Sequence, residues 1–347
     1  MHKDLFAELQ RKIKDDEEQR RQFIEIYGHI RRPMGVELDG KIWMAFDGGI
    51  YQQEQEGPYN FINAIHDHAL HFFGEDFLDA EDRKDLNKRH PAIQWLHIHL
   101  EQIQINNNPS RQDGNGAAWF RFAYDLFTIR DNSKLEADLK DRLLRPQAFQ
   151  AARYELKVAA ICATAGFDLL FEDETDNTTK HPEFIGTDRI SGTKIAVEAK
   201  SRHRNGVLGF DIGSDSPNQP RVGIRRNVID AYGKCAKFPF YVFIDANLPT
   251  CDSSVMKDWE NELEQTFLDL DTEGYADPCP ANAILITNDP SHYVGSSEIG
   301  SKNSYLWVRC FTALNPSIPH PSADIVERLL VAHKQRVSPP SEFYENS

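Results

Sequence analysis

The first 145 residues place their hydrophobic side chains mostly with the period of an α-helix. In residues 2–27, Leu5, Leu9 and Ile13 recur at four-residue spacing, and Gly28 stands where a helix commonly ends. Further helices are predicted at residues 59–73, at 91–106, at 117–130 and in a short segment that ends near residue 144. We therefore expect a mainly helical N-terminal lobe over residues 1–145.

Two stretches of this lobe depart from the helical pattern. In residues 35–51, two Asp-Gly pairs flank β-prone residues such as Trp43 and Phe46, which predicts a small β-hairpin. Residues 106–116, with the sequence NNNPSRQDGNG, are rich in residue types typical of turns. We expect a flexible loop there.

From Pro146 onward, short β-prone runs alternate with helical patterns. A helix from Pro146 to Ala165 precedes predicted strands at 167–172, 182–188 and 193–200. The remaining elements are predicted as a helix at 221–236, a strongly apolar strand at 238–247, a helix near 254–269, strands near 282–287 and 305–311, and a helix at 322–335. This succession predicts an α/β domain over residues 146–347, and an α+β protein overall.

The predicted strand at 193–200 carries the clearest chemical signal. Because side chains alternate along a strand, Ile195 and Val197 share one face, and Glu198 and Lys200 lie on the other. Other acidic-x-lysine triplets occur in the chain, but only this one stands at the end of an alternating apolar strand. A carboxylate and an ammonium group therefore point in the same direction at a strand end.

The neighbouring strand adds a second carboxylate. A tight turn centred on residues 190–192 places the partner of Glu183 between Glu198 and Lys200. Facing or diagonal side chains of a strand pair lie ~5–8 Å apart. A slip of one residue would turn Glu183 to the opposite face, so the register decides whether the three side chains converge. Two carboxylates, water and a substrate phosphate are a common ligand set for Mg²⁺.

This arrangement resembles the restriction-endonuclease-like superfamily, the PD-(D/E)XK phosphodiesterases. The resemblance covers about residues 147–245 and implies a core with a central mixed β-sheet flanked by helices. Pro182-Glu183 stands where the family has Pro-Asp, and Glu198-Ala199-Lys200 stands at its E-x-K motif. The segments HPEF and VEAKSRHR also look like those of a bacterial family of uncharacterised proteins, which supplies no substrate.

The resemblance also implies roles for individual residues. Glu183, Glu198 and the backbone carbonyl of Ala199 would bind Mg²⁺ or Mn²⁺, and Lys200 would be catalytic. Glu155 matches a glutamate that the first helix of the family often adds. Glu183 departs from the usual aspartate, which keeps the charge but extends the reach by one methylene group.

The distribution of charge changes the first impression from composition. A net charge of −15 argues against broad binding of nucleic acid. Residues 189–237, however, hold ten Lys and Arg against four acids, a local charge of +6, which leaves −21 for the rest. Local clusters of this kind contact phosphates. The candidates for substrate binding are Arg202, His203, Arg204, Arg221 and Arg225, although arginines of a helix can also simply face solvent.

Other features set the surroundings. No stretch approaches the ~18 uninterrupted apolar residues of a membrane span, and the charged N-terminus is not a secretory signal. The five scattered cysteines form no CxxC pair, so a reducing cytoplasm is the expected compartment. Among the helical histidines, only His68 and His71 have metal-binding spacing, which makes a histidine-metal hydrolase a remote alternative.

The sequence thus predicts a cytoplasmic, metal-dependent nuclease that acts on nucleic acid, DNA more readily than RNA. The N-terminal lobe would supply target recognition, a homodimer contact or a protein partner. A role in defence against foreign DNA fits only by analogy with the fold. The alternative is a catalytically inactive module of the same fold that binds nucleic acid or a protein.

Overall fold

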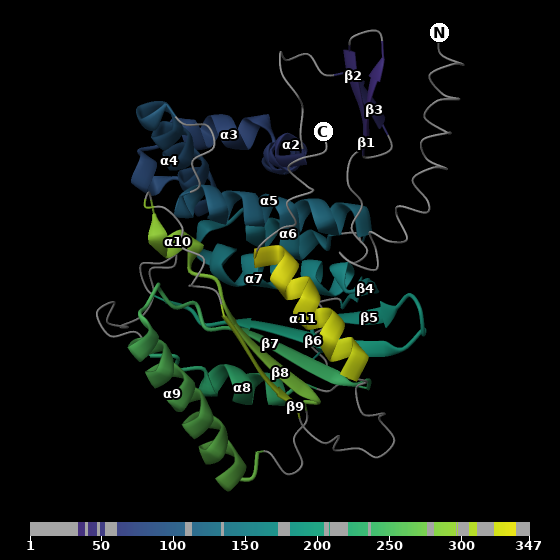
Figure 1. Ribbon diagram of the computed structural model, residues 1–347, viewed down its shortest axis with the longest axis vertical. Helices are drawn as coiled ribbons and strands as arrows, with labels where there is room; N and C mark the ends of the chain where they lie inside the picture. Colours follow the sequence, from purple (N-terminus) through teal and green to yellow (C-terminus); the bar gives the residue numbers. More distant parts are fainter. Residues whose placement is uncertain are drawn as a thin grey trace.

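Figure 1 shows the computed structural model, with its helices and strands labelled in chain order. The described residues are 34–38, 41–46, 49–52, 61–107, 113–132, 135–172, 181–204, 208, 221–234, 237–275, 281–295, 297, 305–310 and 323–337. The helix predicted at 2–27 lies outside them. Among the described helices, none combines the length and the hydropathy that a bilayer crossing requires.

The predicted hairpin near the N-terminus is confirmed, with a third strand added to it. Strands β1 (Met34–Leu38), β2 (Lys41–Phe46) and β3 (Gly49–Gln52) form an antiparallel sheet in chain order. The helical prediction for the rest of the lobe is also confirmed. Its helices are α2 (Phe61–Phe73), α3 (Glu75–Asp82), the short 3-10 helix η1 (Leu86–Lys88), α4 (Pro91–Asn106), α5 (Gly114–Asn132) and α6 (Ala137–Leu143).

Of the loop predicted at 106–116, residues 108–112 lie outside the described residues, and the prediction is wrong for the last three residues, which form the first turn of α5. A Cβ atom on Gly114 would overlap the short helix α10 (Ser291–Val294), and one on Gly116 would overlap the ring of His99 in α4. These glycines therefore allow two other elements to approach α5 closely. The sequence pattern predicted a flexible loop because glycine is common both in loops and at places where two elements pack closely.

The second half of the chain forms a six-stranded mixed sheet, as predicted. Its strands lie side by side in chain order: β4 (Phe167–Phe171), β5 (Phe184–Asp188), β6 (Lys194–Ser201), β7 (Phe240–Asp245), β8 (Ala283–Asn288) and β9 (Tyr305–Cys310). β6, β7 and β8 run parallel to one another, whereas the outer pairs are antiparallel.

Helices cover both faces of this sheet (Figure 1). On one face, α7 (Pro146–Thr164) and α11 (Ala323–Val337) share a hydrophobic cluster with the side chains of Ile195 and Val197. On the other, α8 (Arg225–Tyr232) and α9 (Ser253–Thr272) share a second hydrophobic cluster with Ala196. The alternation predicted for β6 is thus confirmed, and the face of Ala196 is the one that holds Glu198.

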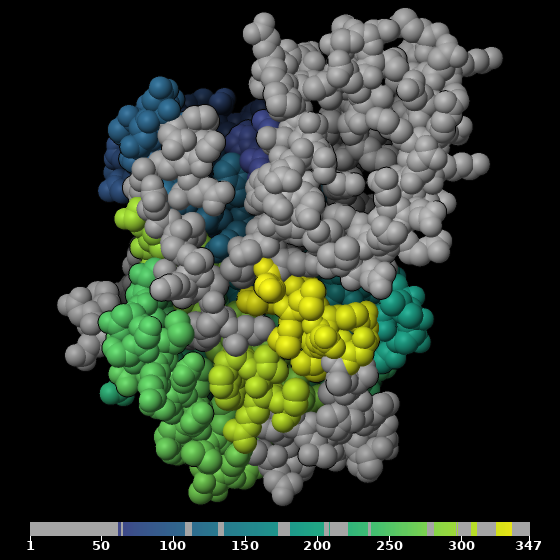
Figure 2. Space-filling model, viewed as in Figure 1, coloured from purple at the N-terminus to yellow at the C-terminus, as the bar shows by residue number. Residues whose placement is uncertain are grey.

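The N-terminal helices join the sheet through α7. Trp119 and Phe127 of α5 belong to the same hydrophobic cluster as Phe149 and Leu156 of α7. On the side shown in Figure 2, α11 lies between the N-terminal helices and the part of the surface formed by β9 and α9. The division into domains at residue 145 stays a prediction, since hydrophobic packing continues across it.

Buried ion pairs also fix α5 and α7 to the sheet. At the end of β8, Asp289 lies 2.5 Å from Arg121 of α5 and 3.3 Å from Lys157 of α7. Arg153 of α7 lies 3.3 Å from Asp245 at the end of β7. Burial opposes the charge of Asp289, but Arg121 and Lys157 outweigh it and hold the pKa of this carboxyl well below its usual range.

Candidate functional site

The strand register brings the two candidate carboxylates together. Phe184 of β5 pairs with Val197 of β6, and the backbone N–H of Glu183 donates to the Val197 carbonyl at 2.9 Å. Glu183 lies one residue before this pairing, and its carboxylate converges with that of Glu198 on the ammonium group of Lys200. The tight turn at residues 189–192 therefore gives the convergent register and not the slipped one.

Lys200 completes the group that the sequence predicts. Its ammonium nitrogen lies 2.5 Å from Oε1 of Glu198 and 3.5 Å from Oε1 of Glu183. Burial opposes the charge of this lysine, but Glu198 and Glu183 outweigh that effect and raise the pKa of Lys200 above its ordinary value. Lys200 is therefore an ammonium ion at neutral pH, shared by two carboxylates.

A second lysine, which the sequence analysis did not single out, reaches the same carboxylate. Nζ of Lys234, just beyond the end of α8, lies 3.4 Å from Oε1 of Glu198. The helical period contains a signal for it, because Val228, Ala231 and Lys234 are spaced three apart and the first two are buried against the sheet. The packing of α8 on the sheet, which the sequence pattern does not show, brings Lys234 near Glu198.

Glu198 is an unusual carboxylate. Its side chain is 0% exposed; Oε1 contacts the ammonium groups of Lys200 and Lys234, and Oε2 has no hydrogen-bond partner among the residues that the structure describes. Burial, and then the charge of Glu183, raise the pKa of Glu198 to about 7, against the opposing effect of Lys200 and Lys234. Buried carboxylates usually accept hydrogen bonds, so these oxygens are suited to a ligand that supplies positive charge.

The two carboxylates fit a hard divalent cation that takes few ligands from the protein and leaves its other positions to water or substrate. The described residues contain no group of three or more His, Cys, Asp or Glu side chains that could hold a metal ion. Glu183 and Glu198 together are the one or two carboxylates that Mg²⁺ commonly takes, with water and substrate phosphate completing the octahedron. Ala199, whose carbonyl the sequence resemblance adds to this set, lines the groove described next.

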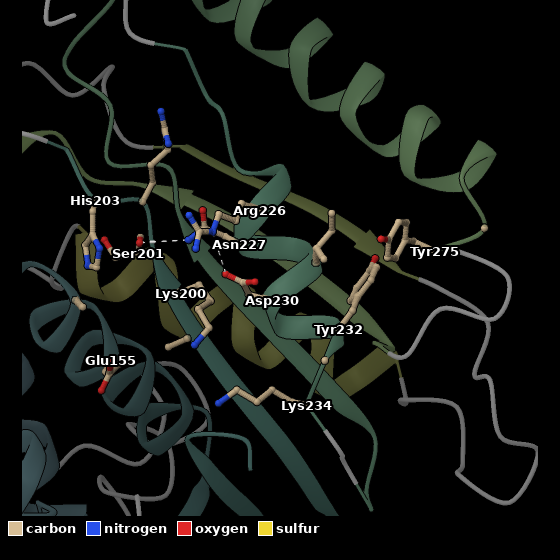
Figure 3. A pocket seen from close by; sticks show the side chains of 16 residues that line it. Glu155, Lys200, Ser201, His203, Arg226, Asn227, Asp230, Tyr232, Lys234 and Tyr275 are labelled. Carbon is tan, nitrogen blue, oxygen red and sulfur yellow. Dashed lines mark hydrogen bonds and ion pairs between the residues drawn. The ribbon is translucent and has the colours of Figure 1, made fainter. Parts of the chain in front are cut away.

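A groove of about 1140 Å³ opens beside these residues (Figure 3). Lys200 and Lys234 reach one part of it from β6 and from the end of α8, and Tyr232 and Tyr275 lie in another part. The polar side chains that line the groove come from the end of β6 and from one face of α8, which contributes Arg226. The groove therefore presents cations and aromatic rings within one cavity.

Glu155 lines this groove but is already engaged. Its two oxygens lie 2.8 and 2.7 Å from two nitrogens of the Arg142 guanidinium in α6. It belongs to α7, which packs on the sheet face opposite to Glu198. The structure thus brings Glu155 close enough to favour the charge of Lys200, and Arg142 holds its carboxylate.

The predicted substrate-binding residues fall into two groups. Arg202 and His203 line the groove, although desolvation and then the charge of Lys200 lower the pKa of His203, so its ring is neutral at neutral pH. Arg204 is placed differently: its guanidinium is buried and donates to the backbone carbonyls of Asn247, Arg221 and Ala246. Arg204 therefore holds loops together, and its role in substrate binding stays a prediction.

The last two candidates of that set lie outside the groove lining. Arg221 is exposed, and its carbonyl accepts from Arg204. Arg225 is exposed and pairs with Glu273 beyond the end of α9. Arg226, one residue further along α8, lines the groove instead and pairs with Asp230 at 3.7 Å. The helical turn separates neighbouring arginines by about 100°, which a local charge count cannot show.

Two histidines of the N-terminal lobe, His66 and His68, take part in packing, whereas His71 is exposed. His66 accepts a hydrogen bond of 3.0 Å from the indole N–H of Trp119, and the ring of His68 packs edge-on to Phe127 with centroids 5.9 Å apart. These contacts account for both side chains without a metal ion.

Comparison with known protein families, with curated proteins and with solved structures finds no match to this chain.

Proposed function

We propose that the chain is a metal-dependent nuclease that hydrolyses phosphodiester bonds of nucleic acid, DNA more readily than RNA. The observation that carries this proposal is Glu198: a fully buried carboxylate in contact with two lysines, one of which also contacts the carboxylate of Glu183, and with one oxygen that has no hydrogen-bond partner among the described residues. The resemblance of Pro182-Glu183 and Glu198-Ala199-Lys200 to the PD-(D/E)XK motifs adds support.

Glu183, Glu198 and the carbonyl of Ala199 would hold Mg²⁺ or Mn²⁺. When bound, such a cation lowers the pKa of its water and stabilises negative charge on the phosphorus oxygens. Lys200 acts as a donor: because its pKa is raised, the ammonium group orients a water molecule and offsets negative charge, and it does not take up a proton.

Arg202 and Arg226 would receive phosphates of the strand that lies in the groove. Guanidinium groups bind phosphate oxygens in pairs, which fixes the strand more firmly than a single ammonium can. The acidic remainder of the chain, at −21, repels nucleic acid elsewhere and limits binding to this groove.

The alternative is an inactive module that binds nucleic acid or a protein partner. A Glu183 side chain turned away from Glu198 would favour that alternative, but both carboxylates contact Lys200. We propose in addition a cytoplasmic location, and a role for the N-terminal helices in recognising the target, a second copy or another protein. A part in defence against foreign DNA rests on fold analogy alone.

The test is incubation of the purified protein with supercoiled plasmid, single-stranded DNA and RNA in Mg²⁺, in Mn²⁺ and in EDTA. We expect cleavage with a divalent cation, none in EDTA, and a loss of at least ~10²-fold in Glu198→Ala and Lys200→Ala. Lys257→Ala, on the exposed side of α9, is the control.

Two outcomes would count against the proposal. Cleavage that persists in both site variants would show that another part of the chain, or a contaminant, is responsible. Binding of nucleic acid without cleavage in either cation would favour the inactive module.

A further inference from the structure

Two ammonium groups contact one carboxylate oxygen in this site. Nζ of Lys200 and Nζ of Lys234 lie 2.5 and 3.4 Å from Oε1 of Glu198. They come from different elements, β6 and the residues after α8, and both line the groove (Figure 3). Their side chains keep 26% and 23% of their exposure, so a ligand in the groove can reach both.

A count of charges shows what the second lysine adds. The carboxylates of Glu183 and Glu198, when ionised, balance the two ammonium groups. A divalent cation held by the carboxylates would leave the group with two positive charges. A phosphodiester carries one negative charge, and the attack of hydroxide on it produces a species with two. Lys200 alone would leave the site one positive charge short of that species.

We propose that Lys234 is a phosphate-binding residue of this site: it leaves Glu198 when a divalent cation binds there and donates to a phosphate oxygen of the strand in the groove. This inference rests on the proposed function. Its position supports it, because the flexible stem of a lysine can move its ammonium group between two acceptors. Lys200 lines the same part of the groove, so one phosphate would be within reach of both ammonium groups.

A merely structural Lys234 would behave differently. If it served only to neutralise Glu198, its removal would raise the pKa of that carboxyl but would leave the number of phosphate contacts unchanged. The dependence of binding on salt separates the two roles. The slope of log K against log salt is negative, and each lost phosphate contact makes it less steep.

The experiment measures equilibrium binding of fluorescein-labelled duplex and single-stranded oligonucleotides over a range of salt concentrations. It is run with Ca²⁺, which takes the same oxygen ligands, and with EDTA, and each probe is checked on a gel to be intact. The proteins are the full-length wild type, Lys234→Gln, Lys234→Arg, and Lys257→Gln as a control for the loss of one positive charge elsewhere. Thermal melts establish that each variant is folded.

With Ca²⁺, we expect Lys234→Gln to reduce the magnitude of the slope by about 0.9 for duplex or about 0.7 for a single strand, the value of one phosphate contact. Lys234→Arg and Lys257→Gln should keep the wild-type slope. In EDTA the difference between wild type and Lys234→Gln should shrink, because Lys234 then stays with Glu198.

An unchanged slope for Lys234→Gln with Ca²⁺, while the wild type binds, would overturn this inference alone. A slope difference of equal size in EDTA would overturn the release from Glu198. A wild type that binds neither probe would overturn the proposed function together with the inference. If Lys234→Gln does not fold, Lys234→Arg decides. Arginine keeps the positive charge, so a salt slope less steep than that of the wild type would contradict a phosphate contact that needs only this charge.

Discussion

The carboxylates of Glu183 and Glu198 converge on one ammonium group, that of Lys200, which lies 3.5 Å from the first and 2.5 Å from the second. Two like charges at this spacing destabilise each other unless a cation lies between them. The arrangement is therefore sensitive to pH, to divalent cations and to the loss of a single charge, and each of these can be measured.

Glu198→Gln should change how stability depends on pH. Folding raises the pKa of Glu198 from 4.5 to about 7, so its contribution is complete below 4.5 and is lost as the pH rises through 7. The loss in the wild type is on the order of 3 kcal/mol. Urea unfolding in EDTA at pH 5 and pH 8 should show Glu198→Gln gaining stability relative to the wild type at the higher pH. The exposed Glu264→Gln should not, and a pH-independent difference for Glu198→Gln would contradict the raised pKa.

Mg²⁺ or Mn²⁺ should raise the melting temperature more at pH 8 than at pH 6. A cation on Glu198 competes with a proton there, so its affinity rises as the carboxyl ionises. A cation at 100 times its Kd stabilises the folded state by about 2.7 kcal/mol. Differential scanning fluorimetry checks this, and Glu198→Gln should abolish the shift. A shift of equal size in that variant would place the cation elsewhere.

Lys200→Met should reduce kcat by at least ~10²-fold with a smaller effect on KM, because the ammonium group acts on charge that develops in the reaction. Lys194→Met is the matched control, since Lys194 begins the same strand on the same face and is exposed. A rise in KM with an unchanged kcat would instead assign Lys200 to substrate binding alone.

Arg121→Ala should destabilise the fold by about 3–5 kcal/mol, because it leaves the buried carboxylate of Asp289 without its nearest cation. Removal of an exposed pair gives the comparison: Lys88→Ala, whose partner is Asp85, should cost less than about 1 kcal/mol. Urea unfolding at pH 7 measures both. Similar losses for the two variants would mean that Arg121 is not needed to compensate the buried charge.

Neighbouring residues show how far local pattern carries the prediction of the site. Arg202 and Arg204 are two residues apart in one basic run, yet Arg202 lines the groove and Arg204 is buried among backbone carbonyls. Both have the same charge and nearly the same surroundings in the sequence. Only the packing of the loop after β6 against residues 246–247 decides which guanidinium remains in the groove.

The sequence by itself determined most of the elements, the alternation along β6 and the turn that brings Glu183 toward Glu198. These features depend on period, on turn residues and on side chains a few positions apart, so the local pattern contains them. The tertiary structure alone decided that Glu155 is held by Arg142, that Gly114 and Gly116 allow close packing, and that Lys234 reaches Glu198. These contacts join residues far apart in the chain or depend on how one element lies against another, and no local pattern records that.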